Sequence, residues 1–171
     1  MNATAVTSAP EIDVLRSTAQ LTDFVLRANV EGISHDDSLI QPPSGANCMN
    51  WVVGHLACIY NNALPLLGQE PVRDKVSLQR YDRGSKPIVD DGEALNFREL
   101  MSLWDEAQKR VEAGLSSLPV SRLDEPAPFS PTNNPNETVR SLLTILLFHQ
   151  AYHAGQTGVL RRLMGKAGAI K

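Results

Sequence analysis

The sequence contains little of what marks several common protein classes. Only two of its 171 residues are cysteines, Cys48 and Cys58, and they do not form a C-x-x-C unit. Zinc knuckles need two such pairs, so that class is excluded. A disulfide framework is also not expected, because two isolated cysteines are typical of reduced thiols in a cytoplasmic protein.

Long hydrophobic runs are missing as well. The longest, Leu142–Phe148, is much shorter than the roughly 20 residues that span a bilayer as a helix. Residues 1–9 hold neither the basic stretch nor the apolar stretch of a secretory signal. We therefore expect a soluble, cytoplasmic protein without a membrane partner, in which residues 1–9 form a flexible tail.

The chain also lacks an excess of positive charge. It has 16 lysines and arginines against 19 aspartates and glutamates, which gives a formal net charge of −3. Binding to DNA or RNA requires a basic face that neutralises phosphates. The one basic cluster, Arg161, Arg162 and Lys166, falls at the end of a predicted helix, where cations complement the helix dipole. No nucleic-acid partner is expected.

Helical periodicity dominates the chain, and no alternating strand pattern competes with it. Apolar residues recur at steps of three and four in four segments. These predicted helices are Pro10–Val30, Asn47–Leu67, Glu93–Leu118 and Thr138–Met164. Asn47 is a candidate N-cap, and the first helix is expected to bury an apolar stripe of Val14, Leu21, Val25 and Ala28. Four long helices predict an all-α four-helix bundle as a single domain of residues 1–171.

The predicted connections differ in length and composition. Residues 68–92, after the second helix, show no clear period and exceed the roughly 2–8 residues usual between bundle helices. This segment is expected to be either a crossover or a functional cover. The connection before the fourth helix is rich in proline, which predicts a stiff, irregular path.

Polar residues interrupt the inner face of the fourth helix. Its interior positions, taken at alternating steps of four and three, are Leu142, Leu146, His149, His153, Gln156, Leu160 and Leu163. His149 and His153 are four residues apart, the spacing by which one helix offers two imidazoles to one metal. His55 holds a matching interior position in the second helix. Three such nitrogens leave a coordination position open, which favours a catalytic metal site.

Other interpretations of these histidines remain open. They could be core residues that only hydrogen-bond, or a structural metal site could be closed by Cys58 as a fourth ligand. Gln150 stands where an H-E-x-x-H peptidase has glutamate. An amide cannot act as a general base, so a thermolysin-like peptidase is excluded. His35, beside two aspartates, is expected at the surface.

Four further residues lie near the histidines along the two helices. Asn62 and Gln156 are each seven residues from a histidine. They are candidates either for supporting a ligand or contacting substrate, or for simple interior hydrogen bonds to backbone carbonyls. Trp51 and Tyr152 are candidate pocket walls, although aromatic residues at helical spacing are more often core. No residue is assigned a catalytic role.

Two stretches resemble the signatures of the DinB-like (damage-inducible) metalloproteins. Residues 50–56, NWVVGHL, resemble the signature of their second helix, and residues 148–156, FHQAYHAGQ, followed by LRRL, resemble that of their fourth. The resemblance covers nearly the whole chain in length and helix order. It implies an up-down-down-up bundle, frequent homodimers, and a divalent metal, zinc or nickel. The implied ligands are His55, His149 and His153.

The resemblance also implies a choice of chemistry. Relatives include bacillithiol S-transferases, a mycothiol-dependent maleylpyruvate isomerase, and proteins known only as metal-dependent hydrolases. No carboxylate lies beside the histidines on the two inner faces, so acid–base help would come from the metal-bound ligand itself or from loop acids such as Asp82, Asp90 or Asp91. This favours transfer of a low-molecular-weight thiol to a small electrophile, because a metal deprotonates a thiol directly. The alternatives are hydrolysis by activated water and a non-catalytic metal-binding stress-response module.

Overall fold

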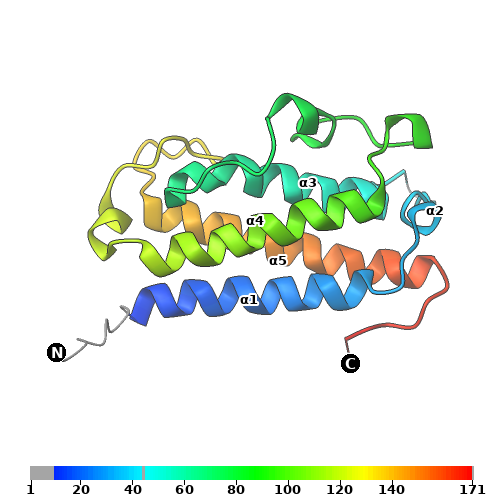
Figure 1. Ribbon diagram of the computed structural model, residues 1–171, viewed down its shortest axis with the longest axis horizontal. Coiled ribbons are helices and arrows are strands. Elements are labelled where there is room, and N and C mark those ends of the chain that lie inside the picture. The colour runs from blue at the N-terminus through cyan, green and yellow to red at the C-terminus, as the bar shows by residue number, and fades with distance from the viewer. Residues whose placement is uncertain (1–9, 44, 171) are drawn as a thin grey trace.

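The computed structural model describes residues 10–43 and 45–170, and four long helices dominate it (Figure 1). They are α1 (Pro10–Val30), α3 (Met49–Ala63), α4 (Phe97–Ser117) and α5 (Val139–Leu163). Helices α1 and α5 run in one direction, and α3 and α4 run in the other. The predicted all-α, up-down-down-up bundle is therefore confirmed. The predicted tail, residues 1–9, lies outside the described residues.

Short helices fill the connections. They are α2 (His35–Ser38) and the 3₁₀ turns η1 (Leu64–Leu67), η2 (Val76–Tyr81), η3 (Asp91–Glu93) and η4 (Val120–Asp124). None of the helices described is long and apolar enough to cross a membrane. The connections therefore carry local order that the sequence pattern did not predict.

Three predicted helix boundaries were wrong. The second helix begins after Cys48 rather than after Asn47, and its last turn is 3₁₀ because Pro65 cannot donate an amide hydrogen bond. The third begins at Phe97 instead of Glu93, because the side chain of Asn96 caps it by accepting from Arg98 N. The fourth begins at Val139, one residue after the predicted start, because Thr138 is its N-cap and forms a capping box with Ser141.

The inner face of α4 is buried along its whole length. Its residues are Phe97, Leu100, Trp104, Ala107, Val111, Gly114 and Leu118. Trp104 is fully buried, and its Nε1 donates to Asp23 Oδ1 on α1 at 2.7 Å. Tyr60 of α3 meets the same indole edge-on, with ring centroids 5.4 Å apart. This indole thus joins three helices through one packed and hydrogen-bonded contact.

The predicted buried stripe of the first helix was wrong for Val14 and Leu21, whereas Val25 is half-buried and packs against the core. Val14 is 65% exposed and Leu21 is 63% exposed. The buried face of α1 consists instead of Ile12, Leu15, Ala19, Thr22, Leu26, Asn29 and Val30. Helix α1 has two apolar faces, and periodicity alone does not tell which one meets the core. At the other end of the bundle, Leu163 of α5 is also exposed rather than interior.

Parallel α3 and α4 require a crossover, and residues 68–96 provide it (Figure 1). Tyr81 anchors this segment on α3 and is fully buried. Its hydroxyl donates to Asn50 Oδ1 at 2.9 Å and accepts from Leu95 N at 2.7 Å. A Cβ at Gly54 would stand 2.1 Å from Cδ1 of Tyr81, so only glycine leaves room for this ring. The crossover is thereby fixed directly above the middle of α3.

Candidate metal centre

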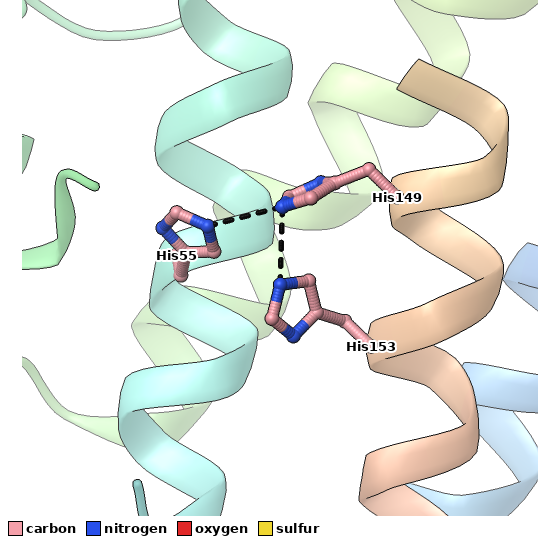
Figure 2. A group of neighbouring side chains, drawn as sticks. All are labelled: His55, His149 and His153. Atoms are coloured by element: carbon pink, nitrogen blue, oxygen red, sulfur yellow. Dashed lines mark hydrogen bonds between the residues drawn. The ribbon is translucent and has the colours of Figure 1, made fainter. Parts of the chain in front are cut away.

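Three imidazoles converge between α3 and α5 (Figure 2). His149 Nε2 lies 3.2 Å from His55 Nε2 and 3.0 Å from His153 Nε2. One nitrogen from each ring lies within 4.8 Å of the others. His55 and His153 are buried and His149 is half-buried. The structure thus brings together the three residues that the sequence singled out, and this cluster could hold a metal ion.

Hydrogen bonds at the far nitrogens set the protonation of two of these rings. His55 Nδ1 lies 2.8 Å from the Tyr81 carbonyl oxygen, and His153 Nδ1 lies 2.7 Å from Gln156 Oε1. Both oxygens only accept, so each Nδ1 carries the proton and donates. His55 and His153 therefore turn unprotonated Nε2 lone pairs toward His149.

Hydrogen bonds among the three histidines cannot satisfy all of their ring nitrogens. His149 Nε2 can donate to one of the two facing lone pairs but not to both, and His149 Nδ1 is buried and has no hydrogen-bond partner among the described residues. A cation between the three Nε2 atoms removes the conflict. Nitrogens about 2.0–2.1 Å from one zinc ion lie roughly 3.3 Å apart in a tetrahedron, close to the spacings of this cluster. The donor set therefore fits a divalent metal.

The electrostatics of the cluster favour neutral rings. Burial, together with the neighbouring imidazoles, lowers the pKa of His149 to about 4. Burial also lowers the pKa of His153 to about 4, although the hydrogen bond that its Nδ1 donates to Gln156 Oε1 raises it, and burial lowers the pKa of His55. Neutral imidazole is the form that binds a metal, so near pH 7 the cluster does not have to lose protons first.

Comparison with known proteins shows the family of the chain. The model of the DinB superfamily matches residues 21–157, which contain all three histidines. The chain belongs to the DinB superfamily. A search of curated proteins finds no significant match. Family membership thus rests on the match over residues 21–157, and the site rests on the geometry of its side chains.

The cluster of this DinB superfamily member has no fourth protein ligand among the described residues. No described cysteine, aspartate or glutamate joins the group of three histidines. Cys58, the candidate fourth ligand, is buried, and its Sγ accepts from Asn62 Nδ2 at 3.6 Å. Burial raises the pKa of its thiol to about 11, so it stays protonated near neutrality. The site has the open, three-ligand pattern and not the closed structural one.

The four supporting residues expected from the sequence occupy different places. Trp51 is buried and stacks on His55, with ring centroids 4.6 Å apart, and Gln156 hydrogen-bonds His153. Tyr152 meets His153 edge-on at 5.2 Å but is 56% exposed, so it borders the cluster from outside. Asn62 bonds to Cys58 and, among the described residues, to none of the three histidines.

The three acidic residues predicted to assist the chemistry, Asp82, Asp90 and Asp91, have different surroundings. Asp91 accepts from His35 Nε2 at 2.6 Å, and Asp90 precedes η3. His35 is half-buried rather than at the surface, because its Nδ1 also accepts from Phe97 N at the start of α4. Asp82 acts on the cluster itself, since its charge opposes the lowering of the pKa of His55.

Three supporting features escaped the sequence analysis. Tyr81 supplies the carbonyl for His55, and Ser85 accepts from Trp51 Nε1 at 2.9 Å. Gly54 makes room for Tyr81. A glycine directly before His55 was a possible sign of a close contact at this point of the helix. The residue that makes the contact, Tyr81, lies in a segment without periodicity and could not be identified from the sequence. Gln150 is fully buried on another side of α5 and donates to Ala19 O, which takes it away from the cluster.

We predict that Gly54→Ala weakens metal binding without removing any ligand. The new methyl group displaces Tyr81 and with it the carbonyl that orients His55. Loss of such a partner of a metal ligand typically costs about 10–100-fold in affinity. Competition against a chromophoric zinc chelator measures the change. Gly155→Ala, at a helical glycine with open space around it, is the matched control. Equal affinities of the two variants would contradict the role of Tyr81.

We also predict that the metal-free protein loses stability as the pH falls from about 6.5 to about 4. In this window the unfolded chain, with ordinary histidine pKa values near 6.5, binds more protons than the folded chain, in which His149 and His153 have pKa values of about 4. Stability is therefore fully present above pH 6.5 and lost on acidification. Melting temperatures across this range should fall less for the double variant His149→Gln, His153→Gln. Parallel profiles would refute the account.

Proposed function

We propose that this chain is a metal-dependent enzyme that transfers a low-molecular-weight thiol to a small electrophile. The observation that carries the proposal is a three-histidine donor set with no further protein ligand among the described residues. A divalent ion bound there, zinc or nickel, would supply Lewis acidity that promotes deprotonation of a coordinated thiol or water. Imidazole suits both metals.

The surroundings of the cluster support thiol transfer over hydrolysis. Activation of water for hydrolysis commonly relies on a carboxylate base beside the metal, and no described carboxylate joins the three histidines. A thiol needs no such base when a cation lowers its pKa. The residues of the chain would position the reactants. Tyr81 and Gln156 fix two ligand rings, and the indole of Trp51 walls one side.

The position of Arg83 favours a substrate that carries a negative charge. It follows Tyr81 by two residues, and its charge contributes to lowering the pKa of both His55 and His149. Its Nη1 donates to Pro131 O at 3.3 Å, and it forms no ion pair with a described carboxylate. A guanidinium without a described carboxylate partner, whose charge reaches the histidine cluster, suits a carboxylate group on the thiol or the electrophile.

A thiol-transfer assay tests this proposal. Wild-type protein with its metal is incubated with an electrophile that bears a carboxylate and with each of several low-molecular-weight thiols. We expect thioether product with at least one thiol, and a decrease in rate of at least about 100-fold in His153→Ala, which lacks a ligand. No product from fully metal-loaded protein with any thiol would reject the transferase. Hydrolysis of an ester by the same sample would then identify the hydrolase alternative.

Arg83→Ala refines the same assay. If Arg83 binds a carboxylate, the variant raises KM by about tenfold for the charged electrophile and leaves KM for its neutral amide unchanged. Lys86→Ala removes an exposed cation from the same segment and serves as the control. An equal effect of Arg83→Ala on both electrophiles would remove Arg83 from substrate recognition.

A further inference from the structure

A hollow of about 240 Å³ lies between α1 and α4. All of the residues that line it belong to these two helices, which lie side by side in Figure 1. The three histidines lie between the other two long helices of the bundle, α3 and α5. We call this feature the α1–α4 hollow, and it shares no residue with the metal centre.

Two bridges between the helices close the α1–α4 hollow at its ends. At one end, Arg27 Nη1 donates to Asp105 Oδ1 at 2.7 Å. At the other end, Glu112 accepts from Arg16 Nε at 2.8 Å and from Gln20 Nε2 at 3.1 Å. Asp105 and Glu112 are about two turns apart on α4, which separates the bridges by about 10 Å. Pockets for drug-sized ligands measure roughly 300–1,000 Å³, so this hollow suits a smaller molecule.

The floor of the hollow carries a buried amide group that makes no hydrogen bond through its nitrogen. Ala19, Gln108 and Val111 line the hollow and are all buried. Gln108 is 9% exposed, and its Nε2 has no hydrogen-bond partner among the described residues. A buried donor without an acceptor destabilises a folded chain, so such a group calls for an explanation. The small side chain of Ala19 on the facing helix leaves room for an acceptor.

Most of the charge around the hollow is already paired within the protein. Asp23 accepts from Trp104 Nε1 through Oδ1 and from Arg27 Nε through Oδ2. Lys109 differs, because its Nζ lies 3.7 Å from Glu106 and its side chain is 79% exposed. An exposed pair of this kind is weak, so the ammonium group can turn to a ligand. The hollow therefore offers a ligand two donors, Gln108 Nε2 and Lys109 Nζ.

The charges that line the hollow are of both signs, and this restricts the charge of a ligand. Three carboxylates and two cationic groups line it: Asp23, Asp105, Glu112, Arg27 and Lys109. A ligand with only a negative charge would be repelled by the carboxylates. A ligand with only a positive charge would leave the amide of Gln108 without an acceptor. A molecule that carries both charges avoids both costs.

We propose that the α1–α4 hollow binds a small zwitterion of the α-amino acid type. Its carboxylate accepts from Gln108 Nε2 and Lys109 Nζ, and its ammonium group lies beside Asp23 and Asp105. The carboxylate supplies the acceptor that the buried amide lacks, and the volume of the hollow favours a short side chain. The site does not depend on the proposed thiol transfer, so failure of the transferase assay would leave it standing.

A binding screen on metal-loaded wild-type protein tests the proposal, with the twenty common L-α-amino acids added one at a time. We expect at least one of the smaller amino acids to raise the melting temperature by about 3 °C or more at ten times its dissociation constant. Equilibrium dialysis then compares this amino acid with its amine, which lacks the carboxylate, and with its acid, which lacks the amino group. Each analogue should bind at least about tenfold more weakly. Equal binding of either analogue would overturn the assignment to a zwitterion.

Variants of the lining locate the bound amino acid. Gln108→Leu removes the amide and should weaken binding by about tenfold or more. Gln79→Leu makes the same exchange at an exposed position of the crossover and should bind like the wild type. Should Gln108→Leu fail to fold, Lys109→Met changes an exposed side chain instead and should weaken binding by about fivefold. Unchanged affinity in a folded variant of either residue would contradict the proposal.

The metal centre is the competing location, because amino acids can also coordinate a metal ion. His149→Ala lacks a metal ligand and should bind the amino acid as tightly as the wild type. Binding that is lost in His149→Ala and kept in Gln108→Leu would place the ligand on the metal and overturn the proposal. Absence of binding by all twenty amino acids would overturn it as well. A Gln108→Leu variant more stable than the wild type would then show that the amide holds structural water only.

Discussion

His149 Nε2 lies 3.0–3.2 Å from the Nε2 atoms of His55 and His153 in a largely buried site. The hydrogen bonds at the far sides of His55 and His153 hold their protons at Nδ1, so too few protons remain between the three rings. A buried acceptor without a donor typically costs about 1–3 kcal/mol. A chain that only needed a packed core would place leucine at these positions, as it does one and two turns earlier in α5. A cation bound between the three Nε2 atoms would take the place of the missing protons and pair with their lone pairs.

The rest of the fold holds the histidine rings in this arrangement. The up-down-down-up order makes α3 and α4 parallel, and parallel neighbours need a long crossover. That crossover is anchored by Tyr81, whose hydroxyl bonds to Asn50 and whose carbonyl accepts from His55. Within α5, the side-chain oxygen of Gln156 accepts from His153 Nδ1, as the Tyr81 carbonyl accepts from His55 Nδ1. The crossover that parallel α3 and α4 require thus both covers the site and supplies the Tyr81 carbonyl that accepts from His55.

The sequence predicted the four helices, and it singled out the three histidines that the fold brings together, because helical periodicity and i,i+4 spacing are local signals. It did not predict which apolar face of α1 is buried. The stripe of Val14 and Leu21 is as regular as the true core face, and only tertiary packing distinguishes them. Nor did it predict Tyr81, because the contact between Tyr81 and Gly54 joins a segment without periodicity to a helix.

The central claim is that His55, His149 and His153 together bind one divalent metal. Elemental analysis of the purified protein, with wild type and His149→Ala prepared side by side in the presence of zinc and nickel, tests it most directly. The account predicts one metal ion per chain in the wild type, and little metal with lower thermal stability in His149→Ala. Wild-type protein without stoichiometric metal, together with a His149→Ala variant of unchanged metal content and stability, would contradict it.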